Sequence, residues 1–409
     1  MNGAANVFTG DVQLSNTGTN TFGDASGDSF TFNGGIDSDD GTTVINAGTF
    51  ATSDDQIDLG TTTVNNSVTI VSGSAAQNIG ATTLADNVTL TLQNGGSGAV
   101  TVTSVSGTAG GTVSNLTVNN TGVNTIGAVG TDIGAVTVNQ SGGMTFSSTV
   151  NAATLTLTDT TGTVAVQGNL TLTSGLATAN QDYNVLITGS TNTIAGDTSF
   201  LNTGSVTIGD AAGDITTFTG GLGITGNVSN PSSVTVAGTI NTSDTRMDIG
   251  AVTLAAATTL DTGNNAAGVL NVGVVTSAGN SLTLDSGSTA GATMSLTSMA
   301  DISGGFTIRD AGGLATIGAL GVGTAGNITV TDSTSGVTFS GVAEAAGNTI
   351  LLSNTTAGQD ITFQGNVEAA TFTTTATSAY DVIIQEDITV TNDCTFGAVG
   401  MLTIGTGSD

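Results

Sequence analysis

The segments VTFSGVAEAAG (Val337–Gly347) and ITFQGNVEAAT (Ile361–Thr371) repeat one pattern, with Phe339 and Phe363 placed 24 residues apart. A period of twenty-odd residues is typical of one turn of a repeat protein. A turn this short cannot bury its own apolar side chains, so we expect successive turns to stack and each strand to pair with its counterpart one turn away. The same Thr-Phe pair, followed by small residues, recurs earlier in the chain at Phe32, Phe146 and Phe218.

The composition favours strands over helices. The chain has 409 residues, 61 of them glycine and one proline, and 8% are charged, against about 25% in an ordinary globular domain. Runs such as VTLTLQ (Val88–Gln93) and NITVTDS (Asn327–Ser333) alternate apolar residues with threonine, which indicates half-buried strands rather than disorder. We therefore predict an all-β fold, a right-handed parallel β-helix (β-solenoid) of roughly 17–20 coils with essentially no helix.

A longer repeat is superimposed on these turns. About residues 20–60 match about residues 206–250, and the clearest matching segments are GDASGDSFTFNGG (Gly23–Gly35) and GDAAGDITTFTGG (Gly209–Gly221). A partial third copy is predicted over about residues 379–409, where AYDVII resembles the earlier DYNVLI. We expect one continuous solenoid over residues 1–409 that contains these copies.

The two long copies differ by a short insertion. Gly23 matches Gly209 at an offset of 186 residues, whereas Ala47 matches Ala237 at an offset of 190. The extra four residues are interpreted as a loop between coils, because a loop insertion leaves the strands on both sides in register. The only proline, Pro231, falls in this region, where it breaks no strand pairing.

The charge excludes several classes of function. The net charge is −29, from 31 acidic residues against Arg246 and Arg309. Such a surface repels nucleic acids and anionic membranes, and no apolar run approaches the roughly 20 residues that span a bilayer. The N-terminal residues do not resemble a secretory signal, so we expect a mature chain or an excised segment. Cys394, alone in the chain, is predicted to be a small buried apolar residue rather than a reactive thiol.

The sequence predicts no enzyme. It has no histidine and only two basic side chains, whereas polysaccharide-active β-helices need a positioned acid or base. Paired carboxylates could hydrolyse a glycoside, but here they recur with the repeat, and a catalytic site is singular. No organic cofactor is implied. A further remote alternative is an ice-binding solenoid, which would need one face with the same threonines in every coil.

Calcium is the more plausible chemistry for the aspartates. Hard cations bind carboxylate, amide and carbonyl oxygens, although no spacing in the chain matches a known calcium loop. The alternative is that these aspartates form turns and keep the protein soluble, with bound cations or salt relieving their repulsion. Loss of stability on chelation at fixed ionic strength would indicate calcium. The candidate calcium ligands are Asp24, Asp28, Asp37, Asp39, Asp40, Asp54, Asp55, Asp58, Asp210 and Asp214.

Several segments carry a resemblance to a known family. GDAAGDITTFTGGLGITG, AGTINTSDTRMDIGAVTLAAATTLDTG and the GNLTLTSG run resemble the β-strand-repeat region of very large bacterial surface proteins of the filamentous-haemagglutinin type. The resemblance covers nearly the whole chain. It implies a parallel β-helix that is secreted and displayed at the cell surface, where it serves adhesion, biofilm matrix or surface structure, with cell-surface glycans as candidate partners.

The two ends of the chain predict self-association. The first residues, through TGDVQLSNTGTNTFGDASGD, and the last, from EDITVTNDCTFGAVG onward, read as coils of the same kind. Because solenoid ends present open strand edges, we expect a structural extracellular protein whose copies join head to tail into a filament, sheath or matrix. The alternative is a rigid stalk segment of a large monomeric adhesin.

Overall fold

The computed structural model describes residues 1–375, 379–397 and 400–405, and within these residues every regular element is a β-strand. The strands are stacked in parallel as a β-solenoid of about 18 turns, which confirms the predicted fold class. The chain divides into two compact units, which are described separately: unit 1 is Met1–Ala195 with Phe200–Ser205, and unit 2 is Gly196–Ser199 with Val206–Asp409. The prediction of one continuous solenoid therefore stays a prediction.

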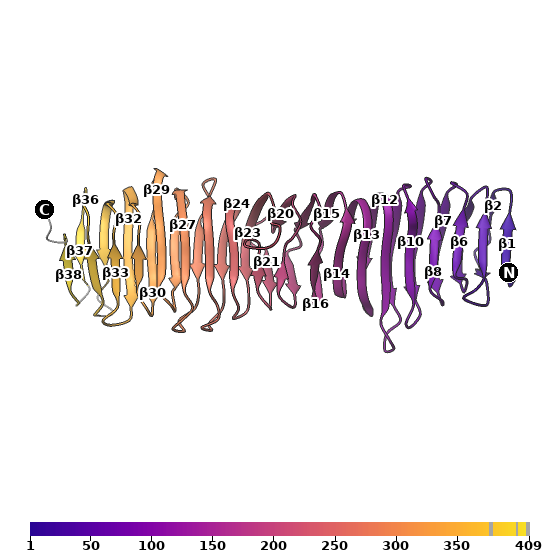
Figure 1. The fold of residues 1–409 in the computed structure, drawn as a ribbon, viewed down its shortest axis with the longest axis horizontal. Helices are drawn as coiled ribbons and strands as arrows, with labels where there is room; N and C mark the ends of the chain where they lie inside the picture. The colour runs from indigo at the N-terminus through magenta and orange to yellow at the C-terminus, as the bar shows by residue number, and fades with distance from the viewer. Residues whose placement is uncertain (376–378, 398–399, 406–409) are drawn as a thin grey trace. The chain divides into compact units, whose positions relative to one another are not determined.

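The strands of unit 1 vary in length from the two residues of β2 to the 16 residues of β12, and they follow one another along the unit (Figure 1). They are β1 (Ala5–Phe8), β2 (Val12–Gln13), β3 (Thr19–Phe22), β4 (Ser29–Phe32), β5 (Ile36–Ile45), β6 (Thr49–Thr52), β7 (Ile57–Val64), β8 (Val68–Val71), β9 (Gln77–Leu84), β10 (Thr89–Gly96), β11 (Val100–Gly107), β12 (Ser114–Val129), β13 (Ile133–Phe146), β14 (Val150–Thr160), β15 (Gly162–Val166), β16 (Leu170–Thr178), β17 (Tyr183–Ile187) and β18 (Thr191–Ile194).

Unit 2 has the same kind of strands. They are β19 (Thr198–Ser199), β20 (Ser205–Ile208, whose first residue is assigned to unit 1), β21 (Ile215–Phe218), β22 (Leu222–Gly223), β23 (Ser233–Asn241), β24 (Met247–Asp261), β25 (Leu270–Thr276), β26 (Leu282–Asp285), β27 (Met294–Asp301), β28 (Phe306–Asp310), β29 (Ala315–Thr324), β30 (Ile328–Ser333), β31 (Val337–Phe339), β32 (Ala343–Thr355), β33 (Asp360–Phe363), β34 (Val367–Thr374), β35 (Asp381–Ile384), β36 (Ile388–Val390), β37 (Cys394–Phe396) and β38 (Leu402–Ile404).

Each turn contributes strands to three faces. In unit 1 the first face contains β4, β6, β8 and β10. The longer β5 contributes to the other two, because its first residues pair with β2 and its last residues with β3. In unit 2, Phe339 pairs directly with Phe363, so the 24-residue spacing is one turn, as predicted.

Inward side chains stack on their counterparts one turn away. The rings of Phe339 and Phe363 lie 4.6 Å apart between centroids and 4° from parallel, and both are fully buried. In unit 1, Phe22 packs edge-on across the core against Phe30 and Phe50, which lie on another face and pair with each other in register. The core of each unit is thus a column of apolar side chains, in which each turn covers the next.

The two copies of the long repeat fall one in each unit and form the same turns. Gly23 and Gly209 both have positive φ, 82° and 74°, a conformation that glycine adopts without strain. Asp54 and Asp244, also equivalent in the repeat, share positive φ values of 62° and 70°. Their carboxylates accept backbone N–H groups of the next turn, from Ser74 and Asn264 respectively.

The insertion changes one face of unit 2. In unit 1 the chain runs as the unbroken strand β5, whereas in unit 2 the equivalent segment is the two-residue strand β22, an irregular loop over residues 224–232, and then β23. Asn227 holds this loop together, since its backbone N–H donates to Asn230 Oδ1 at 3.1 Å and its side-chain amide donates to the Gly223 carbonyl at 3.1 Å. The predicted loop is therefore present and ordered by its own asparagines.

One inner corner is polar, which the sequence analysis did not anticipate. Buried hydroxyls there donate to backbone carbonyls a few residues further along the same bend. Ser72 donates to the Ala75 carbonyl at 2.6 Å, and Thr262 donates to the Gly268 carbonyl at 2.6 Å. These hydrogen bonds offset the cost of burying both groups. The corner is therefore fixed by side-chain oxygens as well as by glycines.

The proposed third copy, over about residues 379–409, shares a buried tyrosine with the earlier segment DYNVLI that it resembles. Tyr183 and Tyr380 are both buried. The Tyr183 hydroxyl accepts the Ala179 N–H at 3.0 Å, and burial raises the pKa of Tyr183 to about 12. The Tyr380 hydroxyl donates to the Leu352 carbonyl at 2.9 Å. Residues 398–399 and 406–409 of this copy lie outside the described residues.

The predicted burial of Cys394 was wrong. The thiol is exposed because β37 pairs with β34 on one side, and no strand of the described residues covers its other side. Partial burial still raises the pKa of the Cys394 thiol. A residue at an inward position is buried only where a further turn covers it.

We predict that Phe363→Ala lowers the free energy of unfolding of unit 2 by about 3–5 kcal/mol, because it removes a buried ring and leaves a cavity. Thr362→Ala, one residue earlier and facing outward, is the control and should cost less than about 1 kcal/mol. Urea unfolding followed by circular dichroism measures both. Equal losses for the two variants would contradict the stacked-ring core.

Candidate functional site

The acidic pairs in the matching turns act first as turn residues. Asp28 Oδ2 accepts the backbone N–H groups of Asp24 at 2.9 Å and Ala25 at 3.2 Å. Asp214 Oδ2 accepts those of Asp210 and Ala211, both at 2.9 Å. The N–H of Asp24 is the main cause that holds the pKa of Asp28 below its usual value. The buried member of each pair is thus already engaged by backbone donors.

The other candidate calcium ligands divide into two places. Asp37 lies in register with Asp58 on the neighbouring turn, and Asp39 is close enough to Asp37 that this carboxylate raises the pKa of Asp39, with smaller contributions from Asp40 and Asp58. Asp54 and Asp55, in contrast, lie in the turn between β6 and β7, outside this cluster.

No metal centre emerges from these groups. Across residues 1–375, 379–397 and 400–405, no three Asp, Glu or Cys side chains gather as a set that could hold one ion. Burial and then the neighbouring Asp214 raise the pKa of Asp210. Calcium at these aspartates stays a prediction.

A column of aspartates in unit 2 was missed by the sequence analysis. Asp261, Asp285 and Asp310 lie in register on β24, β26 and β28. Each begins an Asp-x-Gly triplet, DTG, DSG and DAG, and this recurrence at one-turn spacing is the signal that could have found them. Burial, followed by repulsion from Asp285, raises the pKa of Asp310.

Arg309 partly neutralises this column. Its Nε donates to Asp285 and its Nη2 to Asp261 at 2.8 Å, so that one guanidinium reaches back over two turns. The side chain of Asp285 is only 7% exposed, whereas that of Arg309 is 46% exposed. The other arginine, Arg246, pairs with Asp248 and with the exposed Asp197.

Outward threonines form regular columns on the face that carries β4 in unit 1 and on the face that carries β21 in unit 2. The columns are flanked by different residues from turn to turn, such as Ala51, Val71 and Asn119 two positions on, so neither face repeats as a whole. The threonines in register are Thr49, Thr69, Thr91, Thr117, Thr137 and Thr156 in unit 1, and Thr239, Thr259, Thr283, Thr307 and Thr329 in unit 2.

The last turn of unit 2 exposes residues that are buried one turn earlier. Leu402 and Ile404 pair in register with Val382 and Ile384. Val382 and Ile384 are 2% and 0% exposed, but Leu402 and Ile404 are 42% and 56% exposed. In the first turn of unit 1, Phe8 stacks on Phe32 with ring centroids 5.0 Å apart and is only partly covered.

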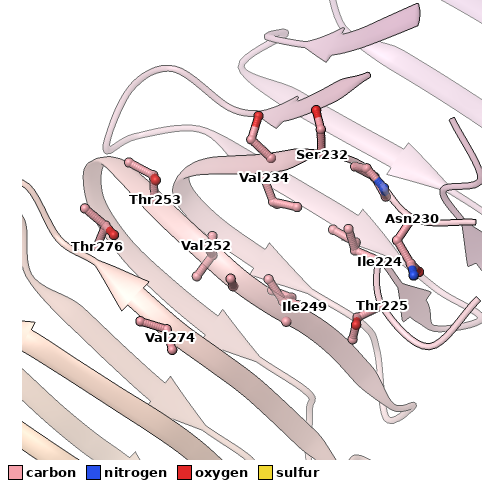
Figure 2. Close-up of a pocket in the computed structure, with 14 residues that line it drawn as sticks. Ile224, Thr225, Asn230, Ser232, Val234, Ile249, Val252, Thr253, Val274 and Thr276 are labelled. Carbon is pink, nitrogen blue, oxygen red and sulfur yellow. The ribbon is translucent and has the colours of Figure 1, made fainter. Parts of the chain in front are cut away.

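The inserted loop of unit 2 encloses one side of a cavity of about 270 Å³. Figure 2 shows Asn230 and Ser232 of the loop segment on one side and Val252 and Thr253 of β24 across from them. The apolar lining is Ile224, Val234, Ile249, Val252 and Val274, with Ala251 and Pro231; the polar lining is Thr225, Asn230, Ser232, Ser233, Thr253 and Thr276. No charged residue lines this cavity.

Comparisons with known proteins add no family. No protein-family model, no curated protein and no solved structure matches this chain. The resemblance to bacterial surface proteins therefore rests on the quoted segments alone. The described residues contain no helix that is long and apolar enough to cross a membrane.

We predict that Arg309→Met lowers the free energy of unfolding by about 1–2 kcal/mol at low salt, because it leaves the nearly buried Asp285 without its cation. Arg246→Met is the matched control and should cost less than about 1 kcal/mol, since its partners are more exposed. Adding Asp285→Asn to Arg309→Met should restore part of the loss in urea unfolding. If the double variant is no more stable than Arg309→Met, the charge of Asp285 is not the cause of the loss, and the prediction is contradicted.

We also predict a pH-dependent effect of Asp28→Asn. The folded pKa of Asp28 lies below its ordinary value, so the ionised carboxylate stabilises the fold above that ordinary value, and this contribution is lost as pH falls through the folded pKa. The variant should be less stable than the wild type at pH 7, and the gap should close below about pH 4. Asp11→Asn, at an exposed site, is the control for general charge effects, and a gap independent of pH would contradict the prediction.

Proposed function

We propose that this chain is a structural extracellular protein whose copies associate head to tail through their terminal turns. The observation that carries the proposal is the contrast between Ile384, fully buried, and Ile404, 56% exposed, at the same inward position of adjacent turns. An added turn of the same kind would cover Ile404 as β38 covers Ile384. The first turn of another copy is such a turn.

Backbone hydrogen bonding supports the same contact. Within the units, inward columns and backbone ladders continue from turn to turn with parallel strands. An outermost strand presents N–H and C=O groups that another parallel strand can pair with. Strands β37 and β38 of one copy would pair in this way with β1 and β2 of the next, which makes the interface heterologous and therefore open-ended.

Charge makes this association dependent on ionic strength. The chain carries a net charge of −29, and the last turns contain the exposed carboxylates of Glu386, Asp387 and Asp393. Copies repel each other at low salt, and the repulsion is screened at about 0.1 M salt, where the Debye length is about 10 Å. Association should therefore increase with salt.

The alternative function is a rigid stalk segment of a large monomeric adhesin. There the exposed turns would be covered by neighbouring coils of the same polypeptide rather than by a second copy. The extracellular location and the candidate glycan partners of either function rest on the resemblance to bacterial surface proteins.

We predict that the purified chain forms end-to-end assemblies as salt is raised, visible by electron microscopy and sedimentation. Leu402→Asp/Ile404→Asp should abolish them, because it places two carboxylates at the contact, and circular dichroism should show that the variant is still folded. The matched control is Val322→Asp, at an outward position that is 57% exposed, and it should assemble like the wild type. Dispersed monomers of the wild type at every ionic strength would favour the stalk and overturn the filament.

A further inference from the structure

We propose that the cavity beside the inserted loop of unit 2 binds one neutral sugar ring of a glycan. The inference concerns a different surface from the terminal turns and does not depend on head-to-tail association. It rests on where the cavity lies, on the chemistry of its lining and on its size.

The cavity lies where the two copies of the long repeat differ. The equivalent segment of unit 1 is the continuous strand β5, while unit 2 has the loop over residues 224–232. Gly250 allows this loop to approach β24, since a Cβ at Gly250 would lie 3.0 Å from Thr225 Cβ. The equivalent corner of unit 1 also has a cavity, of about 240 Å³, but Asp39 and Asp58 line it, whereas no charged side chain lines the cavity beside the four added residues.

The lining selects an uncharged ligand. None of the residues around the cavity is charged, on a chain whose net charge is −29. An anion would find no cationic partner and would be repelled by the protein as a whole. A metal cation would find hydroxyl and amide oxygens without a carboxylate, which is a weak set for a hard ion. A neutral molecule meets neither cost.

The mixture of side chains selects a hydroxyl-bearing molecule with an apolar face. Val252 and Ile249 are buried in the strand, while Val274 is 49% exposed and marks the open side. Hydroxyls of Thr253 and Thr276 and the amide of Asn230 add donors and acceptors. An apolar ligand would stay half exposed in so open a site, whereas a sugar ring packs its C–H face on aliphatic side chains and keeps its hydroxyls hydrogen-bonded to protein or water.

The size selects a single ring. About 270 Å³ is below the range of roughly 300–1,000 Å³ typical of pockets for drug-sized ligands. Because one side is open, the ring can be part of a longer glycan that continues into solvent. Such a site in every copy would suit weak, multivalent attachment, with a dissociation constant on the order of 1 mM for each site.

The test uses saturation-transfer NMR on the whole chain with three neutral probes, the methyl glycosides of mannose, galactose and glucose. We expect transfer from at least one of them at millimolar concentration and none from glucuronate. Val274→Phe should abolish the signal by filling the cavity, and the matched control Val322→Phe, also at an exposed strand valine, should leave it unchanged.

A second variant separates a sugar from an apolar ligand. Thr253→Val/Thr276→Val keeps the shape of the lining and removes two hydroxyls, so it should weaken glycoside binding about tenfold, whereas binding of an apolar molecule would be unchanged or strengthened. Circular dichroism confirms that each variant is folded. No transfer from any of the three glycosides, or equal transfer to the wild type and to Val274→Phe, would overturn the proposal.

Discussion

The structure depends on one constraint: a turn can bury its apolar side chains only against the turns directly above and below it. Parallel pairing at about 4.8 Å per turn places each residue over its equivalent in the next turn. Phenylalanine therefore lies on phenylalanine at Phe339 and Phe363, and threonine on threonine along an outward column. These contacts are favourable, and repetition of the sequence follows from them.

The same constraint places aspartate on aspartate, which is unfavourable at close range. The protein meets this cost in two ways. Arg309 bridges Asp261 and Asp285, and an asparagine follows in register, as where Asn78 donates to Asp58 at 2.6 Å. The last solution recurs in the second copy of the repeat, where Asn271 donates to Asp248 at 2.6 Å. Acidic groups here are held by neighbours of the chain itself.

The fold could be predicted from the sequence because the sequence of a solenoid repeats with the length of one turn. The spacing of Phe339 and Phe363 gave the length of one turn, and alternation with threonine gave the strands. The polar inner corner could not be predicted in this way, because Ser72 and Thr262 look like outward residues until the position of the bend is known. The predicted burial of Cys394 failed for a related reason, because burial there depends on a covering turn that no local pattern encodes.

The candidate site was harder to predict than the fold. The high density of aspartates in the sequence drew attention to Asp37, Asp39 and Asp58. The cavity of unit 2, however, is lined by uncharged residues that no motif distinguishes. What marked it was a difference between two repeats, four extra residues before Ala237.

Arg309 also bears on how the solenoid comes apart. When each turn touches only its neighbours, unfolding can spread from an end one turn at a time. Arg309 bonds to Asp261, 48 residues away, and so couples a turn to the one beyond its neighbour. Thr334 does the same through the Ser288 carbonyl, 46 residues away. The turns between Asp261 and Thr334 should therefore unfold together as one cooperative block. The last turns of unit 2, in contrast, can unfold one at a time.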